Sequence, residues 1–288
     1  MSGTRSDVRS DVRADARADE GVGGIDADAA SYISLLSDQG VAVTGAQSSA
    51  IDAFYVTGKD EGWYSALKRM YLPIWSAAGP NAIDLIGGTS GTFSGSMTHG
   101  SGFVTGDGSS SYFNVGATPS VMGIATGDAF ILRGIHASPA TAQHIACGVE
   151  QTSSSQSLAM LNFGNTASSA GVTYFRQSTS PAEALLTGQG AEYRGIYIGS
   201  CTATNSRFIM RRRSGGSVLG TSGVSSTEAI KDLNPYFMGR NRVGTLNSPS
   251  NGSEFAWALG TGMTQAQATD FTAALETMWE TCTGLTLF

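Results

Sequence analysis

The sequence is poor in charge and in long hydrophobic runs, and each shortage excludes a class of protein. Only 14% of its 288 residues are charged and the net charge is −6, so no broad basic surface is available for nucleic acid. No hydrophobic run is long enough to span a bilayer, so we expect no membrane insertion. The charged amino-terminal stretch lacks the hydrophobic core of a secretion signal, which argues against export by the general secretory route.

Cysteine is also scarce. Cys147, Cys201 and Cys282 lie far apart, and no C-x-x-C or Cys/His spacing typical of a metal site appears. An odd number of cysteines in a chain made in a reducing cytoplasm favours free thiols that pack as small hydrophobic side chains. A disulfide between Cys147 and Cys201 is the alternative, and the sequence leaves it open.

Glycine, in contrast, is abundant at 38 residues, and serine and threonine separate short hydrophobic runs. This pattern predicts many short strands joined by tight turns, and strands without intervening helices predict a two-sheet sandwich. The expected strands are 83–86, 91–95, 102–105, 111–115, 128–137, 143–149, 156–163, 171–176, 185–188, 193–201, 206–213, 217–220, 233–239 and 254–259. In 206–213, Arg207, Ile209 and Arg211 are expected on one face, with Phe208 and Met210 on the other.

Composition divides the chain into three expected parts. Residues 1–24 form a charged amino-terminal arm, residues 25–75 a helical anchor segment, and residues 76–288 the sandwich with one carboxy-terminal helix. The arm repeats aspartate and arginine with a period of four, which alone predicts disorder or a fraying helix. We expect the arm to contact a partner subunit through the arginines that recur every four residues, namely Arg5, Arg9, Arg13 and Arg17.

Capping signals mark the helices. Asp28 is expected to cap a helix that runs through Asp38, and Thr44 with Gln47 forms a capping box for the next one. Apolar residues in 63–71 recur at helical spacing, so this stretch is also expected to be helical. A second capping box, in 264–267, predicts the carboxy-terminal helix.

Catalytic patterns are missing. The histidines His99, His136 and His144 stand apart and match no metal motif. Glycoside hydrolysis needs two carboxylates close together, and here Glu150, Glu183, Glu192, Glu228 and Glu254 are each isolated. We therefore predict no catalytic residue and no enzymatic activity.

Metal and cofactor sites are not expected either. Asp107, between Gly106 and Gly108, is the one carboxylate that could serve calcium there, and calcium needs about six oxygen ligands. A turn-forming aspartate is the preferred interpretation. Glycine-rich loops lack the lysine of a phosphate-binding loop, so no cofactor is predicted.

Two groups of side chains are candidates for binding. Sugars need aromatic surfaces beside hydrogen-bonding groups. The glycan-binding candidates are Tyr112, Asn114, Tyr174, Arg176, Arg240 and Asn241, with ordinary packing as the alternative role for the tyrosines. In the one basic cluster, Arg211 and Arg213 are candidates for contact with an acidic partner, such as the acidic surface of another subunit or an anionic glycan, or else form a solvated strand edge.

Two stretches carry a resemblance to a known family. Residues 101–116 read S-G-F-V-T-G-D-G-S-S-S-Y-F-N-V-G, and the chain closes with F-M-G-R-N-R, the strand F-A-W-A-L-G and a helix. Asn81 to Leu85, Thr92 to Gly95 and a Thr98-His99 turn add to it. The pattern, over about residues 75–288, resembles the concanavalin-like (laminin-G-like) jelly roll of bacteriophage virion proteins.

The resemblance implies a structural protein of the phage particle, a capsid decoration or tail component. It would be made in the host cytoplasm, anchored by its arm and helices to other virion subunits, and present as a homo-oligomer. A carbohydrate-binding, receptor-binding module of a tail fibre that meets a host glycan is the alternative, and a sandwich-fold glycan hydrolase is a third. Location on head or tail, the symmetry and the glycan stay open.

Overall fold

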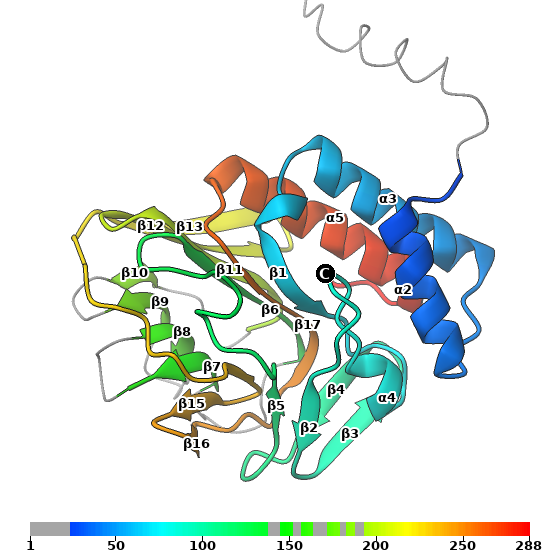
Figure 1. Ribbon diagram of the computed structural model, residues 1–288, viewed down its shortest axis with the longest axis horizontal. Coiled ribbons are helices and arrows are strands. Elements are labelled where there is room, and N and C mark those ends of the chain that lie inside the picture. The colour runs from blue at the N-terminus through cyan, green and yellow to red at the C-terminus, as the bar shows by residue number, and fades with distance from the viewer. Residues whose placement is uncertain (1–23, 138–144, 152–156, 164–171, 179–182, 188–192) are drawn as a thin grey trace, which may run out of the picture.

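The molecule is built in three layers, a group of helices and two β-sheets (Figure 1). The computed structural model describes residues 24–137, 145–151, 157–163, 172–178, 183–187 and 193–288. Both sheets consist almost entirely of antiparallel pairs, and one helix lies at the carboxy-terminal end. The predicted fold class, a mainly β sandwich with few helices, is confirmed.

The first sheet has eight strands in the order β13-β12-β11-β6-β17-β4-β3, with β1 also paired to β17. Its strands are β1 (Leu67–Tyr71), β3 (Met97–Gly100), β4 (Phe103–Gly106), β6 (Ala129–Ala137), β11 (Gly195–Ala203), β12 (Ser206–Arg213), β13 (Gly216–Ser222) and β17 (Ser253–Gly260).

The second sheet has nine strands in the order β10-β9-β8-β7-β14-β5-β2, with β15 paired to β7 and β16 paired to β15. Its strands are β2 (Thr92–Ser94), β5 (Tyr112–Asn114), β7 (Ile145–Glu150), β8 (Ser157–Phe163), β9 (Val172–Ser178), β10 (Glu183–Leu186), β14 (Tyr236–Phe237), β15 (Arg240–Arg242) and β16 (Thr245–Asn247).

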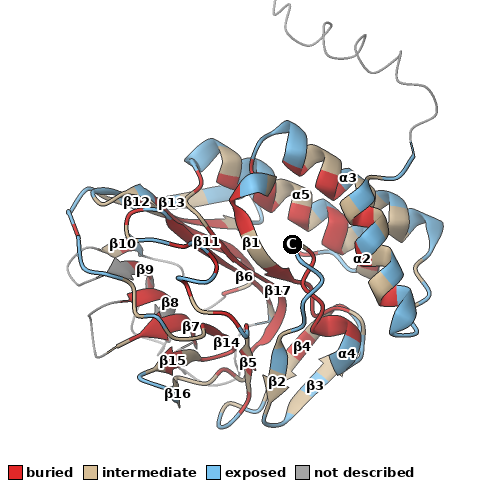
Figure 2. Ribbon diagram, in the orientation of Figure 1, coloured by how far each residue is buried: buried red, intermediate tan, exposed pale blue. Residues whose placement is uncertain are grey.

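The first sheet is buried on both faces, because alternate residues serve two hydrophobic cores. In β6, Ile131 and Ile135 pack into the core between the sheets, whereas Phe130 and Leu132 belong to the core beneath the helices. Figure 2 shows the result as buried residues along the central strands and on the inner sides of the helices. The strand β12 alternates as predicted, with Ile209 in the inter-sheet core and Met210 under the helices.

The helical layer contains α2 (Ala27–Asp38), α3 (Gly45–Asp60) and α5 (Gln265–Thr283), with a 3₁₀ turn η1 (Tyr64–Ala66) and the short α4 (Ala78–Asn81) beside the sandwich. Both predicted capping boxes are present, at the starts of α3 and α5. Rings of Phe54, Trp63 and Phe271 lie 4.8–6.0 Å apart and join α3 to α5. None of the helices in the described part of the chain is long and apolar enough to cross a membrane.

Two predictions for the helical segment are wrong. Asp26, not Asp28, caps α2, because the Asp26 carboxylate accepts the amide hydrogens of Asp28 and Ala29 and also binds Lys59 at 2.8 Å. The stretch 67–71 is strand β1 rather than helix. On this edge of β17, β4 pairs only with Ser253 and Glu254, so residues 257–260 need another hydrogen-bonding partner, which β1 supplies. The division into an arm, a helical segment and a sandwich domain stays a prediction.

Most of the expected strands overlap an observed one, and the exception is 83–86, which makes only isolated bridges. The strands β1, β3, β15 and β16 were not predicted. Thr98 and His99 lie within β3 and pair with β4, so the expected Thr-His turn is wrong. In such short strands the alternation of apolar and polar residues is too brief to predict a strand from the local sequence. Their conformation is determined by pairing with neighbouring strands.

All three cysteines are buried free thiols, so the Cys147–Cys201 disulfide does not form. Burial raises the pKa of each thiol to about 12. At pH 8 we therefore expect about one thiolate in ten thousand, and negligible labelling of the native protein by a thiol reagent. Three thiols should react after unfolding without reductant, and a single reactive thiol would instead reveal a disulfide.

Candidate functional site

The candidate site is the face of the second sheet that points away from the first sheet, which we call the outer face. Phe113 of β5 and Phe175 of β9 lie in the inter-sheet core, so their neighbours Tyr112 and Arg176 point to the opposite side. By the same alternation, Glu150, the neighbour of the buried Val149, belongs to the outer face. Its described members include Tyr112, Asn114, Glu150, Arg176, Glu183, Tyr236, Arg240 and Arg242.

Two tyrosines stack at one part of this face. The rings of Tyr112 and Tyr236 lie 4.3 Å apart with their planes 28° from parallel. Tyr236 is buried, whereas Tyr112 is only half-buried, so part of the pair remains accessible. Burial and the interaction with Tyr112 raise the pKa of Tyr236. Such a pair offers an apolar ring surface together with hydroxyl groups.

A charged cluster adjoins the tyrosines. The fully buried Glu150 carboxylate binds two guanidinium groups, with Arg176 Nη1 2.9 Å from Oε1 and Arg240 Nη1 2.9 Å from Oε2. The same Oε2 lies 3.7 Å from Arg242 Nε, and Arg176 also pairs with Glu183 across β9 and β10. Three guanidinium groups and two carboxylates thus share the face, and we call them the arginine cluster.

The chain reversal after β14 brings the two arginines of β15 to this cluster. Tyr236 pairs with Gly148 in antiparallel fashion, and Arg240 then pairs with the same residue in a parallel register. Met238, between the two strands, adopts a left-handed backbone with φ of 60°. The reversal therefore places β15 alongside β7, with Arg240 and Arg242 over Glu150.

The glycan-binding candidates have different places in the structure. Tyr112, Asn114, Arg176 and Arg240 do share the outer face. Asn241 does not, because it is buried, its amide donates to Asn234 O at 2.9 Å, and its Oδ1 accepts from the Gly244 amide at 2.8 Å. Tyr174 lies in β9, where its backbone pairs with Leu161 and Leu185, and its side chain is outside the described part of the structure.

The basic partner-contact candidates are also divided. Arg211 is buried, donates to the Arg194 carbonyl at 2.7 Å and lies over the Tyr197 ring, so its expected role at the surface is wrong. Arg213 is exposed at the end of β12 and stays a candidate. Arg212, between them, turns to the helices and pairs with Glu276. The arm residues Arg5, Arg9, Arg13 and Arg17 lie outside the described residues.

Sequence reasoning missed the roles of Glu150, Glu183 and Arg242. Although isolated in sequence, Glu150 and Glu183 converge on Arg176 from different strands. The Arg176 guanidinium fills the space between the two carboxylates, which a sugar and a water molecule would have to occupy in a glycoside hydrolase. Alternation in 183–186 could have indicated the Glu183–Arg176 pair, since a hairpin sets them opposite each other.

The Gly-Asp-Gly turn is explained by its own hydrogen bonds. Asp107 Oδ2 accepts a hydrogen bond from the Ser110 hydroxyl, and Oδ1 accepts the amide hydrogens of Ser109, Ser110 and Ser111 at 2.8–2.9 Å. Together these hydrogen bonds lower the pKa of the Asp107 carboxyl, against the effect of burial. The preferred interpretation as a turn-forming aspartate fits these contacts. Among the described residues, no group of three or more His, Cys, Asp or Glu side chains is placed to hold a metal ion.

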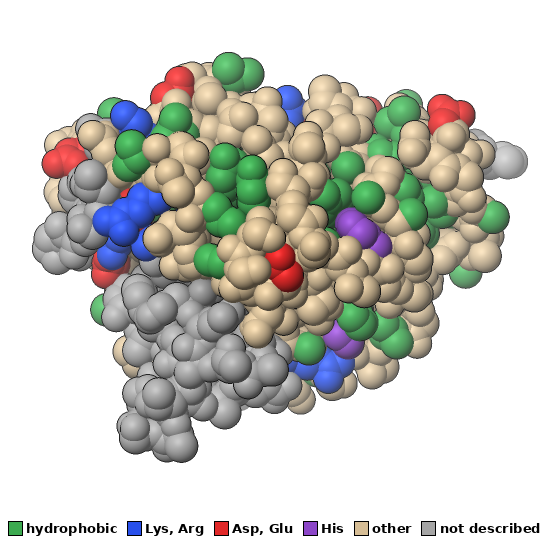
Figure 3. Space-filling view, turned by 90° about the horizontal axis from the view of Figure 1, so that it is seen from below, with side chains coloured by type: hydrophobic (Ala, Val, Ile, Leu, Met, Phe, Trp, Pro, Cys, Tyr) green, Lys and Arg blue, Asp and Glu red, His purple; other side chains and the backbone are tan. Residues whose placement is uncertain are grey.

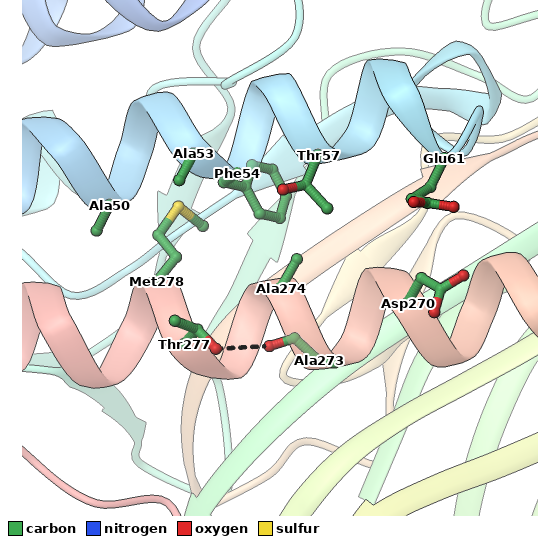
Figure 4. A pocket seen from close by; sticks show the side chains of 10 residues that line it. All are labelled: Ala50, Ala53, Phe54, Thr57, Glu61, Asp270, Ala273, Ala274, Thr277 and Met278. Carbon is green, nitrogen blue, oxygen red and sulfur yellow. Dashed lines mark hydrogen bonds between the residues drawn. The ribbon is translucent and has the colours of Figure 1, made fainter. Parts of the chain in front are cut away.

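Apart from the outer face, the molecule has a hollow between α3 and α5 (Figure 4), with a volume of about 390 Å³. Its walls are mostly small side chains, among them Ala50, Ala53 and Ala274, with Glu61 and Asp270 at one end. The one aromatic residue that lines this hollow, Phe54, is buried, so it offers little ring surface to a sugar. Elsewhere, on the lower side of the molecule, polar and backbone atoms predominate and Lys and Arg side chains gather toward the left (Figure 3).

No protein-family model matches this sequence, and no curated protein matches it. Similar solved structures include domain 4 of AbnA, a GH43 extracellular arabinanase from Geobacillus stearothermophilus, in complex with arabinotriose. That chain is 13% identical with a TM-score of 0.43, over 72% of this chain and 98% of the other.

Two further similar structures are binding modules. The CBM2 module of the evolved Dit of Lactobacillus casei BL23 phage J-1 is 8% identical with a TM-score of 0.38, over 59% of this chain and 81% of the other. The CBM40 of the Ruminococcus gnavus IT-sialidase, bound to alpha2,3 sialyllactose, is 13% identical with a TM-score of 0.35, over 51% of this chain and 83% of the other. Likeness at this level concerns the β-sandwich architecture and does not indicate what this chain binds.

Proposed function

We propose that this chain is a non-catalytic glycan-binding protein of a bacteriophage particle, and that its outer face is the binding surface. The observation that carries the proposal is the stacked pair of Tyr112 and Tyr236 beside the arginine cluster on one sheet face. An aromatic ring binds the C–H face of a sugar, and guanidinium groups bind its hydroxyl oxygens. Both kinds of group are held in place by strand pairing and ion pairs, which reduces the entropic cost of binding.

The assignment to a phage particle is supported by the resemblance of residues 75–288 to phage jelly-roll proteins. In that setting, the helices α2, α3 and α5 use their apolar faces to cover the first sheet, so anchoring falls to the arm and to exposed residues such as Arg213. Several copies on one particle would add avidity to weak sugar contacts. Capsid decoration and tail component are both consistent with this arrangement.

A glycan array tests the proposal. The purified protein, coupled to a multivalent carrier, should bind a subset of the glycans, and Tyr112→Ala should weaken binding of the best one about tenfold, since one lost aromatic contact costs about 1.4 kcal/mol. Tyr64→Ala is the matched control, because Tyr64 is a half-buried tyrosine in the helical layer. It should stay within about twofold of the parent protein.

The outcomes separate the candidate functions. Binding that Tyr112→Ala leaves unchanged would place the sugar elsewhere, and no binding to any glycan would reduce the function to a purely structural role. Incubation with the bound glycan should release no reducing sugar, because Arg176 lies between the two outer-face carboxylates. Release of sugar that Glu150→Gln abolishes would overturn the non-catalytic assignment.

A further inference from the structure

The outer face carries more positive than negative charge, although the chain as a whole has a net charge of −6. The arginine cluster counts three guanidinium groups against two carboxylates, a surplus of one positive charge. The segments 152–156 and 179–182, which adjoin Glu150 and Glu183 in sequence, contain no charged residue, whereas the segment 188–192 contains Glu192. The surplus is counted over the described residues of the arginine cluster.

The surplus charge is concentrated on β15. Arg240 and Arg242 are two residues apart on one strand and point to the same side, and both approach the single oxygen Oε2 of Glu150. Burial lowers the pKa of Arg240, the Glu150 carboxylate opposes this change, and repulsion from Arg242 and Arg176 adds to it. An anion bound beside these side chains would relieve that repulsion.

Arg242 is the member best placed to reach a ligand. One third of its side chain is exposed, compared with about a tenth for Arg176 and Arg240. Its nearest contact with Glu150 is 3.7 Å, longer than a strong ion pair, and a guanidinium group has five N–H donors. It can therefore give a bidentate contact to a carboxylate without breaking the 2.9 Å contacts that hold the rest of the cluster.

The hairpin that carries Arg242 is held in an unusual conformation. Val243, at its tip, is exposed and has φ of 53°, a left-handed backbone that a β-branched residue rarely adopts. The Val243 amide donates to the Glu150 carbonyl at 3.1 Å, and the Gly244 amide donates to Asn241 Oδ1 at 2.8 Å. Positive φ at both Val243 and Gly244 is what a two-residue type I′ hairpin turn requires, and the hydrogen bond from Val243 to Glu150 holds this hairpin against β7.

We propose that the glycan bound on the outer face is acidic, and that Arg242, with Arg240 beside it, recognises its carboxylate. This inference rests on the proposed function. The tyrosines would take the ring faces of the sugar, and the guanidinium groups its charged substituent. Because charge-assisted contacts are about twice as strong as neutral ones, the acidic group would decide which glycans bind.

Paired probes that differ only in whether their carboxyl groups are charged test this inference. Trigalacturonate is compared with its fully methyl-esterified form, and 3′-sialyllactose with its methyl ester, so the two arms distinguish a uronic acid from a sialic acid. In at least one pair, the acidic member should bind at least about tenfold more tightly than the neutral one, and the preference should shrink as salt rises from 50 to 500 mM.

The variants assign the preference to a residue. Arg242→Gln should reduce the preference for the acidic member at least about fivefold. Its affinity for the neutral member should stay within about twofold of that of the parent protein, and a thermal melt verifies that the variant is folded. Lys68→Gln, which removes a positive charge from β1 of the first sheet, should change neither affinity. Equal binding of acidic and neutral members would overturn the acidic-ligand inference and leave glycan binding intact. No binding of any sugar in the probes or on the array would contradict the proposed function itself.

Discussion

Glu254→Met is expected to lower the free energy of unfolding by about 3–5 kcal/mol, a large part of the stability of an ordinary domain. Glu254 and Arg133 form an ion pair in which neither side chain is exposed, in the core between the two sheets. Burial raises the pKa of Glu254, and the contacts with Arg133 and with Trp257 Nε1, 2.7 Å away, oppose this rise. Removal of the carboxylate would leave the Arg133 charge in the core without its partner carboxylate.

The double variant Arg133→Met/Glu254→Met makes the argument quantitative. If the loss comes mainly from an uncompensated charge, removal of both partners should cost less than removal of either one. The remaining loss should be about 1–3 kcal/mol, since the buried indole N–H of Trp257 then lacks its acceptor. Glu228→Gln, at an exposed position, is the control and should change the stability by no more than about 0.5 kcal/mol.

Denaturant unfolding of five proteins measures these differences, namely the parent protein, Glu254→Met, Arg133→Met, the double variant and Glu228→Gln. A double variant that is as unstable as the sum of the two single variants would show that the two side chains contribute independently. A Glu254→Met protein with unchanged stability would mean that the pair is not buried as described. Either result would contradict the role of this ion pair in the inter-sheet core.

Local signals in the sequence predicted the elements whose causes are local. The capping boxes of α3 and α5 involve residues three positions apart, and both were predicted correctly. The strand β1 could not be predicted in this way, because its conformation depends on the edge of β17, about 190 residues later in the chain. Its apolar residues at helical spacing are buried equally well in a strand.

The same distinction applies to the candidate site. Alternation should have separated Arg240 from Asn241, since adjacent residues of a strand face opposite sides. In contrast, no local pattern indicates that Arg240 meets Glu150, because that contact depends on the parallel pairing of β15 with β7. Arg211 shows a third case, in which the alternation was correct but the sequence did not reveal that its face is the interior one.

Trp279→Ala is expected to cost about 3–5 kcal/mol, because the indole joins α5 to the first sheet. Its side chain is fully buried, its ring lies 4.8 Å from the ring of Phe255 in β17, and its N–H donates to the Gly102 carbonyl at 2.9 Å. The substitution leaves a large cavity and deprives a buried carbonyl of its donor. Trp279→Phe keeps part of the packing and should lose about 1–3 kcal/mol.

The shape of the unfolding curve shows whether the helical layer and the sandwich form one cooperative unit. The helices and the first sheet share a continuous hydrophobic core, so far-ultraviolet ellipticity and tryptophan fluorescence should report a single transition in the parent protein and in both variants. Thr277→Ala, at an exposed position of α5, should move the midpoint very little. Two separate transitions would mean that the helices fold independently of the sandwich. In that case the helical ellipticity would be lost first, and the unfolding free energy of each transition would depend less steeply on denaturant concentration. In that case, the helical segment would be released at little cost and could serve as the particle anchor, whereas a single transition leaves that role to the amino-terminal arm.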